Sequence, residues 1–122
     1  MLSKLVIFVG MKENSQLLKG TLTTVILKLL NDNHRMYGYE MTKKVKEITN
    51  GSLLITEGAL YPALHKLEAE GHIKSTIEQF ENRPRKYHQL TTDGKKEAKK
   101  KLSDLFNFIN DLQSILQLKP VV

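Results

Sequence analysis

The sequence has no cysteine, no tryptophan, only three prolines among 122 residues, and no long apolar run. Without cysteine the chain has no disulfide, no thiolate nucleophile and no cysteine-ligated zinc or iron–sulfur cluster. Its longest apolar runs, such as residues 5–9, fall far short of the ~20 residues that span a bilayer. We therefore expect a soluble, cytoplasmic protein that has no cofactor and no membrane partner.

Motifs of common enzyme chemistry are missing as well. The chain has no Gly-x-Ser-x-Gly elbow, phosphate-binding loop or paired-histidine metal motif. His65 and Glu68 have a spacing that can share a metal, but no third ligand is in view, so a surface pair is the simpler interpretation. His34 in a turn and His88 in a strand are interpreted as ordinary polar residues. The sequence thus predicts neither an enzyme nor a metal site.

What the chain does have is a localised positive charge. Its net charge is +6, and residues 83–101 carry eight basic and two acidic side chains, so this segment accounts for the whole excess. A neutral body with one basic segment indicates a polyanionic partner, with nucleic acid favoured over anionic lipid.

The N-terminal residues give little information. Residues 1–10 combine one lysine with an apolar run too short for a signal peptide, and Met11 looks like an equally good start. We assign residues 1–14 to an arm of uncertain order and give it no function.

Three helices are expected between residues 15 and 71. The first ends at the polar turn 31–35, the second runs from near Gly38 to Asn50–Gly51, and the third has Thr56 as N-cap and Gly71 as its stop. Pro62 removes one backbone hydrogen bond from the third helix and is expected to bend its first turns. The expected core faces are Leu18, Leu22, Val25, Ile26, Leu29 and Leu30; Met41, Val45 and Ile48; and Leu60, Ala63, Leu64 and Leu67.

After Gly71 the apolar period changes from helical to alternating. Ile73, Ser75 and Ile77 share one side of a strand, residues 81–85 form a polar loop, and residues 86–90 return as a second strand. Thr91 or Thr92 then caps a last helix that reaches about residue 118, before Pro120. The predicted fold is mainly α (α+β), with a winged helix-turn-helix domain at residues 15–91 and a C-terminal dimerisation helix at residues 92–122.

Two surfaces of this fold suit DNA. The outer face of the third helix shows Gly58, Pro62, His65, Lys66 and Ala69 with Tyr61 on its flank, and these side chains are small, flat or able to donate to phosphates and base edges. Glu57, Glu68 and Glu70 lie nearby and repel phosphate, so that face taken alone is better interpreted as a solvated helix surface. Arg83, Arg85 and Lys86 at the hairpin tip favour the DNA interpretation.

The last helix carries an apolar seam with heptad spacing, namely Ala98, Leu102, Leu105, Ile109, Leu112 and Leu116. We expect Leu102, Leu105, Ile109, Leu112 and Leu116 to form a dimer interface, the alternative being a helix folded back on its own domain. Leu105, Phe106, Phe108 and Ile109, facing the partner's first helix, are the candidate ligand pocket, although aromatics at this spacing also form plain core.

Four ordered motifs resemble the PadR family of bacterial transcriptional regulators. They are Tyr37-Gly38-Tyr39-Glu40; Gly58 to Leu64 (GALYPAL); Leu67 to Ile73 (LEAEGHI); and Arg83 to Tyr87 (RPRKY) followed by Leu90-Thr91 and Gly94. The resemblance covers roughly residues 15–118 and is closest to the short branch of the family, which has a single C-terminal helix.

This resemblance implies a homodimeric repressor that binds an operator in double-stranded DNA. The third helix enters the major groove, the wing contacts the backbone or minor groove, and the last helix makes the dimer. Members of the short branch often respond to small aromatic or drug-like effectors; some bind flat drugs through a tryptophan, which this chain lacks. The predicted DNA-contacting residues are Tyr39, Thr56, Tyr61, His65, Lys66, Arg83, Arg85 and Lys86.

Two other classes of protein remain open at this point. One is a winged-helix protein that binds nucleic acid non-specifically, or binds a protein partner, without sensing a ligand. The other is a small coiled-coil dimerisation module whose lysines only improve solvation. Dependence of DNA binding on salt and on sequence separates the three.

Overall fold

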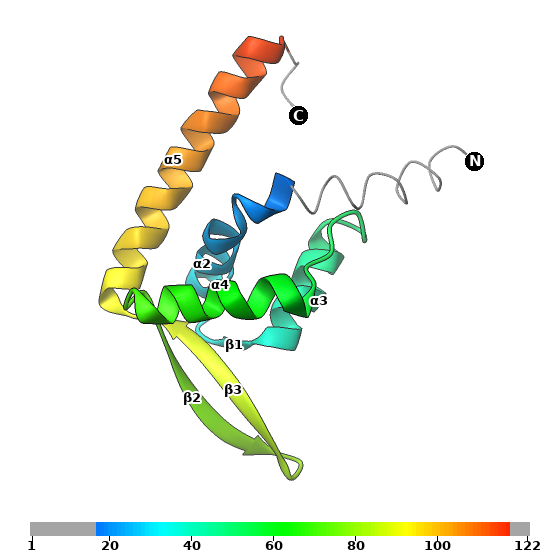
Figure 1. Cartoon of the computed structure of the whole chain (residues 1–122), viewed down its shortest axis with the longest axis vertical. Helices are drawn as coiled ribbons and strands as arrows, with labels where there is room; N and C mark the ends of the chain where they lie inside the picture. Colours follow the sequence, from blue (N-terminus) through cyan, green and yellow to red (C-terminus); the bar gives the residue numbers. More distant parts are fainter. Residues whose placement is uncertain (1–16, 118–122) are drawn as a thin grey trace, which may run out of the picture.

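A computed structural model describes residues 17–117 of the chain (Figure 1). Its elements are, in order, α2 (Leu22–Asp32), β1 (Met36–Tyr37), α3 (Gly38–Ile48), α4 (Glu57–Ala69), β2 (Ile73–Phe80), β3 (Arg83–Leu90) and α5 (Thr92–Leu116). Helices α2, α3 and α4 form the body, the β2–β3 hairpin projects from it, and α5 leaves it in another direction. The predicted α+β architecture, with a wing following a helix-turn-helix, is confirmed.

One hydrophobic core lies between α2, α3 and α4. Ile26, Leu27 and Met41 are completely buried. Met36, Ile73 and Leu90 of the sheet and Ala98 of α5 complete the core. Leu27 lies outside the predicted apolar stripe. It is buried because α2 is central, with α4, α5 and β3 packed around it.

The first two helices differ from the expectation. The first is interrupted, because the chain turns at Gly20 and Thr21, where the Thr21 N–H and hydroxyl both donate to the Leu18 carbonyl (2.9 and 3.1 Å). Ile48 was wrongly placed in the core: α3 ends at this residue and its side chain is 66% exposed. The arm predicted at residues 1–14 lies outside the described residues.

The hairpin is longer and its turn tighter than predicted. Strands β2 and β3 pair from Ile73↔Leu90 to Phe80↔Arg83, so the turn is only Glu81 and Asn82, both with positive φ (49° and 63°). This is the geometry of a two-residue hairpin turn, which asparagine tolerates well. The predicted loop at residues 81–85 is therefore wrong after Asn82, and Arg83, Pro84 and Arg85 belong to β3.

Projection of the hairpin also explains a second difference. Ile77 lies on the same side of β2 as Ile73, but it is 68% exposed whereas Ile73 is buried, because the hairpin extends beyond the body at that point (Figure 1). The two-residue strand β1 was not expected. It pairs with β3 through Met36↔His88 and Tyr37↔Tyr87, which makes β3 the central strand.

Helix caps are formed as predicted. The Thr56 hydroxyl accepts from the Ala59 N–H (3.2 Å) at the start of α4, and the Thr91 hydroxyl accepts from the Gly94 N–H (2.9 Å) at the start of α5. α4 continues through Pro62 to Ala69, and the left-handed Gly71 (φ 79°) follows just after its C-cap Glu70. The first turns of α5 pack on the body, whereas its distal half stands away from it (Figure 1). Residue 118 and Pro120 lie outside the described residues.

Candidate nucleic-acid interface

The outer face of α4 is free for a partner. Leu60, Leu64 and Leu67 are almost fully buried on its inner side, while Tyr61, His65 and Lys66 are exposed on the opposite side. The helix spacing therefore separates the residues that hold the fold from those that can contact a ligand, as the sequence predicted.

A groove of about 270 Å³ runs between α4 and the wing. It brings together five of the eight residues predicted to contact DNA; these are Tyr39, Tyr61, His65, Arg85 and Lys86. The helix face and the basic hairpin, separated by about twenty residues in the chain, thus form one continuous surface with donors on both sides.

The other three predicted residues lie outside this groove. Thr56 caps α4, Lys66 is exposed on the same helix, and Arg83 is exposed beside the hairpin turn, opposite Phe80. Thr56 lines a second, open groove of about 880 Å³ together with Tyr39, Lys43 and Lys46.

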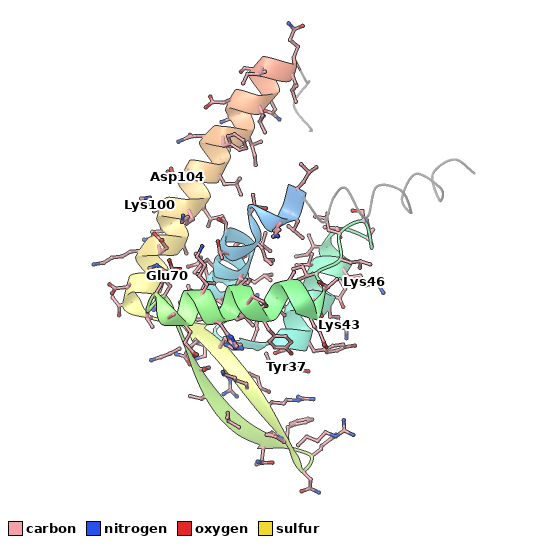
Figure 2. The ribbon with its side chains drawn as sticks, in the orientation of Figure 1. Tyr37, Lys43, Lys46, Glu70, Lys100 and Asp104 are labelled. Carbon is pink, nitrogen blue, oxygen red and sulfur yellow. The ribbon has the colours of Figure 1, made fainter. Side chains whose placement is uncertain are left out.

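Lys43 and Lys46 were not singled out from the sequence. Both project from α3 near the N-terminal end of α4, on the side of the second groove (Figure 2). The sequence feature that could have indicated them is the basic run KKVK at residues 43–46, in which Lys43 and Lys46 lie one helix turn apart on either side of the buried Val45. They extend the positive charge of the wing across the helix-turn-helix.

Arg83, Arg85 and Lys86 were predicted to be phosphate donors grouped at the hairpin tip, but they do not all share one face of the wing. Because side chains alternate along a strand, Arg83 and Arg85 share one face of β3 and Lys86 lies on the other. Lys86 shares its face with His88, on the side of α4. Arg85 is half-buried, with its guanidinium against the rings of Tyr37 and Phe80.

Two of the acidic residues near α4, Glu68 and Glu70, have defined positions in the structure. The Glu68 carboxylate accepts a hydrogen bond from the Ser75 hydroxyl (2.5 Å), which lowers the pKa of Glu68. Glu68 therefore links the outer side of α4 to β2. Glu70 lies at the end of α4 remote from Lys43 and Lys46 (Figure 2).

His88 is not the ordinary polar residue that the sequence suggested. It is only 5% exposed, and its Nδ1 atom has no hydrogen-bond partner among the described residues. Burial lowers the pKa of His88, and the nearby Lys86 lowers it further. The imidazole is therefore held neutral beneath the groove, since a buried charge lacks solvation there.

We expect His88 to make the fold sensitive to mild acid. Because its pKa is lower in the folded than in the unfolded chain, the unfolded chain takes up the proton first as pH falls. The free energy of unfolding should be constant from this source above pH ~6.5 and should decrease below it. Urea unfolding at pH 7.5 and 5.5 should show a smaller decrease for His88→Gln than for wild type. His34→Gln, at an exposed histidine, should behave as wild type, and equal decreases in both variants would contradict this role.

The apolar seam on α5 is only partly covered within one chain. Leu102, Leu105 and Leu112 are half-buried, whereas Ile109 is 45% and Leu116 58% exposed. Phe106 and Phe108 are also exposed. The candidate ligand pocket, which was expected to face the partner's first helix, therefore stays a prediction.

A helix-turn-helix of α3 and α4, followed by a two-stranded wing that forms a groove with α4, defines a winged helix-turn-helix protein. No helix in residues 17–117 is long and apolar enough to span a bilayer.

Comparison with known proteins agrees with this class. The family profile of the PadR-like transcriptional regulators matches residues 26–100. A transcriptional regulator from Clostridium thermocellum is 32% identical, with a TM-score of 0.74 over 82% of this chain and 94% of its own. A PadR-like transcriptional regulator from Bacillus cereus is 26% identical, with a TM-score of 0.71 over 86% of this chain and 100% of its own. An uncharacterised protein of Lysinibacillus sphaericus is 34% identical over 66% of this chain and 74% of its own.

The chain belongs to the PadR-like family. Members of this family are transcriptional regulators and not enzymes, which agrees with the missing catalytic motifs.

Proposed function

We propose that the protein is a cytoplasmic, homodimeric repressor that binds a specific operator in double-stranded DNA. The observation that carries this proposal is the groove shared by α4 and the wing, which gathers Tyr39, Tyr61, His65, Arg85 and Lys86. In this arrangement α4 enters the major groove and reads base edges, and the wing contacts the flanking backbone.

The seam on α5 supports the homodimer. Its heptad spacing is typical of helix–helix packing, and Ile109 and Leu116 remain exposed in the single chain. A second copy covers these side chains and places two copies of α4 for the two halves of an operator.

We further propose that a small aromatic or hydrophobic effector relieves repression. Leu105, Phe106, Phe108 and Ile109 of one copy, with the partner's first helix, supply its apolar walls. Because the effector would bind between the subunits, it can change the spacing of the two α4 helices. Titration of aromatic compounds against operator-bound protein tests this part: release supports it, and no release across a broad panel contradicts it.

Fluorescence-detected binding to DNA from upstream of the protein's own gene tests the main proposal. The assay uses two salt concentrations, with and without excess unrelated duplex. Tight binding that survives the competitor is expected for a specific repressor. Binding that disappears with competitor or salt would show that the protein binds DNA only non-specifically. No binding at all would refute the proposed function.

Substitutions on the two sides of the groove should have different effects. Tyr61→Ala and His65→Ala remove side chains facing the bases, so we expect the affinity ratio between operator and unrelated DNA to decrease by roughly tenfold.

Arg85→Ala removes a phosphate contact, so affinity should fall about equally for all sequences and the salt slope should decrease by ~1 per wing. Competition titrations over a salt series measure both quantities. An unchanged salt slope in Arg85→Ala would refute the phosphate contact.

A further inference from the structure

The guanidinium of Arg85 is held by aromatic rings from two other strands. Its Cζ atom lies 3.9 Å from the centroid of the Phe80 ring on β2 and 4.4 Å from that of Tyr37 on β1. Tyr37 is itself fixed, because its ring meets Tyr87 edge-on at 5.5 Å and stacks with Tyr39 at 6.5 Å. Arg85 is therefore in a defined position, unlike a typical surface arginine.

Stacking leaves the donors of this guanidinium available. The N–H groups of arginine lie in the plane of the group, so rings against its face do not occupy them. Within residues 17–117, Arg85 has no carboxylate within ion-pair distance. Although Glu78 lies opposite Arg85 in the register, the Glu78 carboxylate pairs with Arg35.

Arg35 is a second stacked arginine, and unlike Arg85 it is paired with a carboxylate. Its guanidinium also stacks on a ring, that of Tyr87 at 4.0 Å, but it donates to Glu78 at 3.2 Å. Two stacked arginines thus lie on the same face of the sheet, and between them only Arg35 is paired with a carboxylate of the described residues. The charge of Arg85 is fixed beside the groove and has no anionic partner in this part of the chain.

We propose that Tyr37 and Phe80 are positioning residues for DNA binding, which hold the Arg85 guanidinium so that it donates to a phosphate without first being ordered. This inference rests on the proposed function and adds to it two residues that contact no DNA themselves. A free arginine loses rotamer freedom when it binds, so removing a ring should weaken binding through Arg85 alone.

A double-mutant cycle on the full chain tests this coupling. Phe80→Leu should weaken operator binding about fivefold and shift the salt slope toward that of Arg85→Ala. In the Arg85→Ala background the same substitution should have no further effect. Phe80→Tyr keeps the ring and should bind as wild type. Equal weakening by Phe80→Leu in both backgrounds would overturn the proposal, since the ring would then act independently of Arg85.

A measurement without DNA separates this inference from the proposed function. In NMR spectra of the free protein, ring currents should shift the Arg85 Nε–Hε signal, which is assigned by its absence in Arg85→Lys. Phe80→Leu should move the signal toward the position of an unstacked arginine, and Phe80→Tyr should keep it. An Arg85 signal unchanged by Phe80→Leu would overturn the positioning role even if the protein binds DNA. A ring-shifted signal in a protein that binds no DNA would instead refute the proposed function.

Discussion

Replacing Gly94 with alanine is expected to lower the melting temperature by about 10–20 °C. A Cβ atom at this position would lie 1.8 Å from the carbonyl oxygen of His72, which is far inside any permitted contact. A clash this close costs about 3 kcal/mol, the upper end of the usual range for overpacking, and each kcal/mol lowers the Tm of a chain of this size by roughly 3–6 °C.

The junction around Gly94 has little freedom to relax. The clashing His72 carbonyl accepts from the Thr91 N–H (3.1 Å), and the Thr91 hydroxyl donates to the Gly71 carbonyl (2.6 Å). The same hydroxyl accepts from the Gly94 N–H as the cap of α5. A backbone shift that accommodates the methyl group would therefore break the cap or the contact between the end of α4 and the start of α5.

Gly58→Ala is the matched control, because Gly58 is also in the first turn of a helix. The nearest atom to a Cβ there is 4.0 Å away, so alanine should leave the Tm unchanged or raise it slightly through its better helix propensity. Thermal unfolding followed by circular dichroism compares the two variants. Equal melting temperatures for Gly94→Ala and wild type would show that the α4–α5 junction is not closely packed in solution.

The sequence was sufficient to predict the elements with strong periodicity or clear caps. The core faces of α2 and α4, the caps at Thr56 and Thr91, and the order of helices and hairpin all follow from local patterns. The heptad spacing of α5 is equally local. Such features need only the neighbours of a residue along the chain, which the sequence contains.

Features that depend on strand register were not predictable in this way. The strand β1 is two residues long and has no period to detect. Pro84 was taken as part of a loop, and the two-residue turn at 81–82 instead places it, with Arg85, in β3. Since that turn sets which residues oppose each other, the burial of His88 and the contact of Arg85 with Phe80 appear only in three dimensions.

A charge placed on the exposed part of the α5 seam should convert the protein to a monomer. Ile109→Glu changes a side chain that is 45% exposed in one chain, so the protomer itself should fold. In a dimer packed through the seam, the carboxylate would be buried without a partner, which costs several kcal/mol. The dimer dissociation constant should therefore increase by roughly 100-fold or more.

Asn110→Glu adds the same charge to the next residue, which is polar, exposed and outside the seam. It should remain a dimer in sedimentation-velocity experiments at concentrations where Ile109→Glu sediments as a monomer. Circular dichroism should show equal helix content in both variants. If Ile109→Glu sediments as a dimer, the seam is not the interface.

Loss of the dimer should then reduce operator binding far more than any single contact does. A monomer occupies one half-site and loses the gain from linking two α4 helices, which is roughly 100-fold or more. Asn110→Glu, with its charge on α5 and distant from the groove, should bind within about twofold of wild type. A monomeric Ile109→Glu that binds the operator as tightly as wild type would show that one winged-helix domain is sufficient, and that α5 serves a purpose other than pairing two DNA-binding surfaces.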